Sequence, residues 1–176
     1  MNKNSVNPKL LTLAIMILAA SFTRLIPHPP NFTAVAAIAL FGGTYFDKKW
    51  NAFLIPLIAM FLTDIILGFH RNMMSVYLAF ILITFIGLGV RNSKKITGIF
   101  LASISASVSF FIITNFSTWI LGTMYPKTGA GLAECFIAAI PFFHYTLLGD
   151  LFYVGVLFGA FELAKFKFPR LAEIKA

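Results

Sequence analysis

The chain has 176 residues, of which 59% are hydrophobic and 11% are charged, and its formal net charge is +8. Soluble domains carry about 25% charged residues, so this composition excludes an ordinary water-soluble fold. The positive charge lies between apolar stretches and predicts no nucleic-acid partner, and the single cysteine excludes an internal disulfide.

The apolar stretches predict six membrane-spanning helices in a single integral membrane domain that covers residues 1–176. A spanning helix needs about 20 apolar residues, so six helices with short loops use nearly the whole chain. The fold class is therefore an all-α membrane protein, a six-transmembrane-helix bundle. The expected helices cover residues 10–26, 32–46, 50–69, 73–90, 96–121 and 141–164.

Proline and glycine mark where these helices end. Pro27 stops the first helix, and residues 27–31 are expected to form a stiff polar loop. The second stretch spans only about 22 Å against a hydrocarbon core of about 30 Å, so we expect it inside the bundle. Residues 122–139 are expected to form the longest loop, and Pro141 is expected at the start of the last helix.

Lysine and arginine are distributed unevenly between alternate loops. By the positive-inside rule the richer side faces the cytoplasm, so both termini are expected to be cytoplasmic. The richer side carries eleven of these residues, which are Lys3, Lys9, Lys48, Lys49, Arg91, Lys94, Lys95, Lys165, Lys167, Arg170 and Lys175. The other side carries three, which are Arg24, Arg71 and Lys127.

Polar residues within or beside the helices gather toward the outer side. An ionisable residue in a spanning helix costs a few kcal/mol, so it usually faces the bundle interior and has a partner or a task. This layout predicts an external pocket for a small-molecule ligand, lined by Arg24, His28, Asn31, Asp64, His70, Asn115, Trp119, Tyr125, His144 and Asp150. A structural alternative stays open, in which Asp64 pairs with Arg24 or Arg71 and Asp150 with a neighbouring hydroxyl.

The polar residues carry no motif of a catalytic centre, so we expect neither an enzyme nor a cofactor. No two of the three histidines are spaced three or four residues apart, as ligands on one helix face would be. Cys135 could offer a soft thiolate to a metal ion, although a cysteine in such a place is more commonly a small buried apolar residue.

Several segments are similar to those of an uncharacterised family of small bacterial membrane proteins. They are residues 24–32 (RLIPHPPNF), Asn115-Phe116 with Trp119, residues 124–128 (MYPKT) and residues 149–153 (GDLFY). The six short helices, residues 41–43 (FGG) and residues 64–68 (DIILG) also resemble the S components of energy-coupling-factor transporters. The resemblance extends over nearly the whole chain.

This resemblance implies the substrate-binding component of a micronutrient transporter in the bacterial cytoplasmic (inner) membrane. S components capture vitamins or metal ions from outside and then associate with an energy-coupling membrane subunit and ATPases. Some act alone, including ones similar to cobalamin carriers, which often use a cysteine as a cobalt ligand. Ala14, Ala19 and Ala20 do not form the Ala-x-x-x-Ala pattern that commonly docks the coupling subunit, so a solitary carrier stays open.

The alternative function is a non-transporting scaffold in the lipid bilayer, similar to the rod-shape-determining membrane proteins. In a scaffold the polar residues would only join helices, and the core would be solid. A ligand-binding protein would instead contain a cavity of a few hundred Å³ on the outer side.

Overall fold

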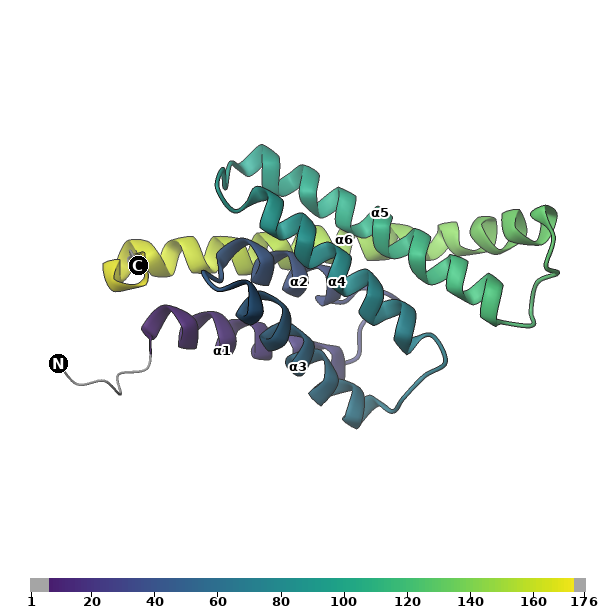
Figure 1. The fold of residues 1–176 in the computed structure, drawn as a ribbon, viewed down its shortest axis with the longest axis horizontal. Helices are drawn as coiled ribbons and strands as arrows, with labels where there is room; N and C mark the ends of the chain where they lie inside the picture. Colours follow the sequence, from purple (N-terminus) through teal and green to yellow (C-terminus); the bar gives the residue numbers. More distant parts are fainter. Residues whose placement is uncertain (1–6, 173–176) are drawn as a thin grey trace.

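The computed structural model describes residues 7–172, which form a bundle of six α-helices (Figure 1). No β-strand occurs between residues 7 and 172. Five helices are long and apolar enough to cross a membrane, and α2 is a shorter apolar helix. The elements are α1 (Pro8–Phe22), the 3-10 helix η1 (Thr23–Leu25), α2 (Val35–Tyr45), α3 (Lys49–Leu67), α4 (Met73–Val90), α5 (Ile96–Leu121), α6 (Gly129–Lys167) and the 3-10 helix η2 (Pro169–Leu171).

The first five helices occur in the expected order, although α1 begins two residues and ends four residues earlier than expected and is followed by η1. α4 and α5 have the bounds predicted from the sequence, and α3 differs by one or two residues at its ends. α2 begins at Val35, three residues later than expected, because the turn around Asn31, which has a positive φ of 64°, continues to Thr33, whose N–H donates to the Asn31 carbonyl at 3.0 Å. The turn is closed by Phe32, whose N–H donates to the Pro29 carbonyl at 3.0 Å.

The last helix corrects the expectation of a long loop over residues 122–139. α6 begins at Gly129 rather than at Pro141, so the loop covers only residues 122–128. The Thr128 side chain caps the helix by accepting from the Gly131 N–H. Pro141 lies inside α6, where it removes only one backbone hydrogen bond, a loss that spanning helices tolerate. With 39 residues, α6 is about 58 Å long and extends well beyond a hydrocarbon core of about 30 Å.

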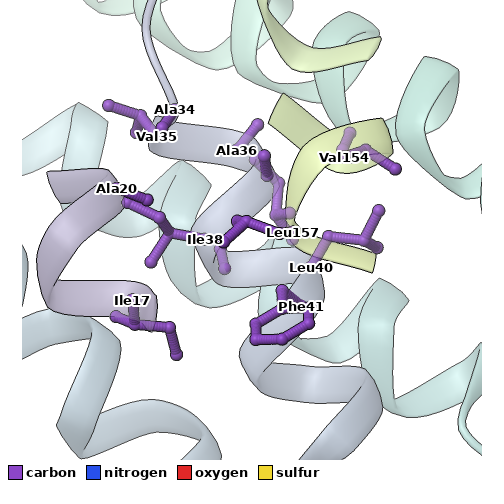
Figure 2. Packing of buried hydrophobic residues seen from close by; sticks show 14 of the residues in the cluster. Ile17, Ala20, Ala34, Val35, Ala36, Ile38, Leu40, Phe41, Val154 and Leu157 are labelled. Carbon is purple, nitrogen blue, oxygen red and sulfur yellow. The ribbon is translucent and has the colours of Figure 1, made fainter. Parts of the chain in front are cut away.

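α2 is enclosed by the other five helices, as its short apolar sequence predicted. All its 11 residues are buried, and it packs against α1, α3, α4, α5 and α6. Its length of about 16 Å is about half the hydrocarbon core, so it leaves space beyond at least one of its ends. Figure 2 shows part of this packing, with labelled neighbours from α1 and α6: Ile17, Ala20, Val154 and Leu157.

Two glycines allow α2 and α4 to approach at backbone distance. A Cβ atom on Gly87 would lie 2.4 Å from the Leu40 carbonyl oxygen and 3.0 Å from the Cα atom of Gly43. The Thr44 hydroxyl, which also bonds to its own helix, lies 3.3 Å from the Gly87 carbonyl oxygen. Small residues at such a contact allow helices in lipid to gain close packing.

Arg91 caps the C-terminal end of α2, where backbone carbonyls have no partner within the helix. Its guanidinium donates to the carbonyls of Gly43 at 3.4 Å, Asp47 at 3.1 Å and Phe46. A cation at this end also complements the negative pole of the helix dipole. Arg91 therefore joins the loop after α4 to the central helix.

Replacing Arg91 with methionine is expected to lower the free energy of unfolding by about 1.5–3 kcal/mol, since hydrogen bonds from a charged donor contribute on that scale. Lys49→Met is the matched control, because it removes an exposed positive charge from the same end of the bundle. Denaturant titration of both variants in detergent micelles measures the difference. Equal stability of the two variants would show that the cap contributes nothing.

The alternating helices separate the basic residues into two groups at opposite ends of the bundle (Figure 1). We call the end with loops 46–48 and 91–95 the basic end, and the end with loops 26–34, 68–72 and 122–128 the cavity end. Arg24, Arg71 and Lys127 lie at the cavity end, and the other described lysines and arginines lie at the basic end. Lys3 and Lys175 lie outside the described residues, and the cytoplasmic position of the termini stays a prediction.

Candidate functional site

A cavity lies at the N-terminal end of α2, on the side of the bundle where α2 stops short of its neighbours. It has two adjoining lobes of about 210 Å³ and about 280 Å³. The walls come from η1, α4, α5, α6 and the loops 26–34 and 68–72, and the first turn of α2 closes the first lobe. Both lobes share Asn31, His70, Val76, Phe110 and Thr146.

The first lobe brings together five of the residues that we predicted to contact a ligand, which are Arg24, His28, Asn31, His70 and Asp150. They come from η1, the loops before α2 and α4, and α6, which are far apart in the sequence. Thr33, Val35 and Ala36 complete the wall at the start of α2. The helix-breaking segment before α2 therefore folds over the cavity and supplies much of its polar surface.

Arg24 is held at the cavity by a buried network on α3. Its Nη1 atom lies 2.8 Å from Asp64 Oδ1 and 2.7 Å from the Thr63 hydroxyl. The Tyr77 hydroxyl donates to Asp64 Oδ2 at 2.8 Å. Asp64 is 1% exposed and lies behind Arg24, outside the cavity lining, so it positions and neutralises the guanidinium. This is the arrangement that the structural alternative described for Asp64.

Asp150 lies in the wall of the first lobe, next to the start of α2. Its Oδ2 atom accepts a hydrogen bond of 2.6 Å from the Ser107 hydroxyl on α5, and the Ala36 backbone N–H donates to the same carboxylate. The carboxylate therefore caps α2 at the positive end of its dipole. The neighbouring Gly149 admits the loop before α2, since a Cβ there would lie 3.1 Å from Phe32 Cα and from Thr33 N.

The second lobe is lined by aromatic rings and short polar side chains. Asn115, another predicted site residue, lies here, and its side-chain amide donates to the Phe111 carbonyl at 2.8 Å. Asn72 donates to the Thr118 hydroxyl at 2.8 Å across α4 and α5. The remaining walls of this lobe come from Phe110, Phe111, Thr114, Ala139, Phe142 and Phe143.

Three further predicted residues lie outside both lobes. Trp119 and Tyr125 belong to the region of the 122–128 loop, where the Trp119 indole donates to the Pro126 carbonyl at 2.8 Å. Lys127 completes this turn by donating to the carbonyls of Gly122, at 2.5 Å, and Trp119. His144 is exposed on α6 and packs against Tyr145, with ring centroids 4.1 Å apart and ring planes tilted by 40°.

Cys135 is buried in α6, and its Sγ atom lies 3.5 Å from the Asn115 carbonyl oxygen. Within residues 7–172, no group of three or more histidine, cysteine or acidic side chains is placed to hold a metal ion. The local contact of the thiol is thus a weak hydrogen bond beside the second lobe.

The predicted site lacked the threonines, valines and phenylalanines that line the cavity. Thr146 precedes Asp150 by four residues, and this spacing places both on one helix face. The phenylalanines gave no such signal, because the chain has 21 of them and most positions of a spanning helix are apolar.

No curated protein and no solved structure matches the chain. Residues 4–171 match a family of unknown function, DUF6580. The match extends over nearly the whole length, including every helix and every residue of the cavity. The chain therefore belongs to this uncharacterised family.

Proposed function

We propose that the chain is a substrate-binding membrane component that captures a small micronutrient from outside the cell. The observation that carries the proposal is the two-lobed cavity, which is polar on one side, aromatic on the other and closed by the buried helix α2. Ligand sites are typically concave and largely apolar, with a few convergent polar groups. A scaffold would have a solid core at this end of the bundle, so the cavity favours a ligand-binding protein over a scaffold.

The proposed orientation follows the distribution of charge. With the basic end in the cytoplasm, the cavity end faces outward, and a bacterial inner-membrane protein would meet its ligand there. The similarity to S components supports a role in uptake, either with an energy-coupling membrane subunit or alone. Lobes of about 210 Å³ and about 280 Å³ favour a small vitamin-like molecule over one of cobalamin size.

Mass spectrometry of protein that has been purified gently from its native membrane tests the proposal. We expect the wild type to retain a small molecule and Val76→Phe to lower its occupancy by about tenfold, because a ring at Val76 would intrude on the space that both lobes share and cost at least about 1.4 kcal/mol of binding. Leu78→Phe is the control, since Leu78 is exposed on the same helix and lines neither lobe.

Two results would contradict the proposal. One is a folded wild type that retains no small molecule under any mild extraction. The other is a bound molecule whose occupancy is the same in Val76→Phe and Leu78→Phe, because its site would then lie outside the cavity.

A further inference from the structure

The acidic residues of the described chain differ sharply in their partners. Asp47, Asp64 and Glu162 form ion pairs with Lys9, Arg24 and Lys165, at 2.6, 2.8 and 2.6 Å respectively. Glu134 is exposed on α6. Between residues 7 and 172, Asp150 is thus the one buried carboxylate with no lysine, arginine or histidine nitrogen within 4.0 Å.

Asp150 has two hydrogen-bond donors beside it and no cation among the described residues. A hydroxyl and a backbone N–H at a helix N-terminus both stabilise negative charge on an acceptor. Arg24 also lines the first lobe, but its guanidinium is already paired with Asp64. A buried carboxylate is costly unless it is paired or protonated, so the first lobe presents an acidic group that a cation from outside the chain would neutralise.

From this charge balance we infer that the cavity selects a small organic cation, whose ammonium group pairs with Asp150. The inference rests on the proposed function, since it names the chemical class of the ligand of that same cavity. The aromatic second lobe suits a planar ring, because cations and aromatic bodies both pack favourably against phenylalanine faces. A divalent metal ion fits less well, because the described residues place only one carboxylate here.

A charge series on one carbon skeleton tests this inference on the wild type alone. The probes are phenethylamine, 2-phenylethanol and phenylacetate, which are cationic, neutral and anionic at neutral pH, and binding is measured by calorimetry in detergent micelles. We expect the amine to bind at least about tenfold more tightly than the alcohol, as for a hydrogen bond to a charged group, and phenylacetate to bind most weakly.

The variant Asp150→Asn removes the charge and keeps an oxygen that can accept from Ala36 or Ser107. This variant should lower the affinity for the amine by about tenfold or more and change the affinity for the alcohol by less than about twofold. Glu134→Gln removes an exposed carboxylate that lines neither lobe and should leave the order of the three probes unchanged. Failure of Asp150→Asn to fold leaves the wild-type series as the deciding measurement.

Binding of the alcohol or of phenylacetate as tightly as the amine, or binding of none of the three, would overturn the inference. An unchanged amine affinity in folded Asp150→Asn would do the same. The proposed function fails separately, when the wild type retains no small molecule from its native membrane. If it retains an anionic or neutral molecule there, the proposed function stands and the choice of a cation is wrong.

Discussion

Replacing Arg24 with glutamine is expected to lower the free energy of unfolding by about 3–5 kcal/mol, because it leaves the Asp64 carboxylate buried without a cation. Asp64 is 1% exposed, and Arg24 supplies its ion pair at 2.8 Å. The Tyr77 hydroxyl would remain as a donor but would not neutralise the charge. Unfolding in detergent, followed by circular dichroism against denaturant, measures the loss.

A double-mutant cycle separates this pairing from a general effect of removing arginine. Arg24→Gln combined with Asp64→Asn should recover much of the lost stability, since neither charge is then left alone. Tyr77→Phe is the matched mild variant and should cost about 1 kcal/mol, as for one hydrogen bond. If the double variant is less stable than Arg24→Gln by the full cost of Asp64→Asn, the two residues are not coupled and the network is wrongly described.

Gly87→Ala is the second change with a large expected effect. Its Cβ would lie 2.4 Å from the Leu40 carbonyl oxygen, so α4 and α2 would have to separate along their contact. Overpacking of this kind costs about 1–3 kcal/mol, and more where backbone must move. The change should therefore lower the midpoint of thermal unfolding and weaken the packing of the central helix.

Gly89→Ala on the same helix is the control for Gly87→Ala. A Cβ at Gly89 meets no atom within 4 Å, and alanine favours a helix over glycine by about 1 kcal/mol. We expect Gly89→Ala to be neutral or stabilising while Gly87→Ala destabilises. The same sign for both would mean that helix propensity, and not the α2–α4 contact, determines the effect.

Much of the fold follows from hydropathy alone, because a spanning segment must be apolar over its whole length. The helices α4 and α5 were located to the residue, and the burial of α2 followed from its shortness. The start of α6 was missed because Gly129, Gly131 and Pro141 each disfavour a helix in water. Here the Thr128 cap and the bundle outweigh those preferences.

The cavity was predicted less completely, for a physical reason. Arg24, His28 and Asp150 could be assigned to one end of the bundle, since that follows from the alternating direction of the helices along the chain. Their partners could not, because the rotation of each helix is determined by packing, and Arg24 and Arg71 were equal candidates for Asp64. Arg91 was interpreted only as a loop charge, because its contact with the C-terminal end of α2 joins residues far apart in the sequence.

The enclosure of α2 also constrains how the chain enters the membrane. A segment of 11 residues is too short to be released into lipid as an independent span, so α2 depends on its neighbours for a stable position. Those neighbours include α4, α5 and α6, which are synthesised after it. Until they arrive, the apolar residues of α2 lack their final packing partners. α2 therefore reaches its final packing late, and its apolar residues must be protected during membrane insertion until α4, α5 and α6 are in place.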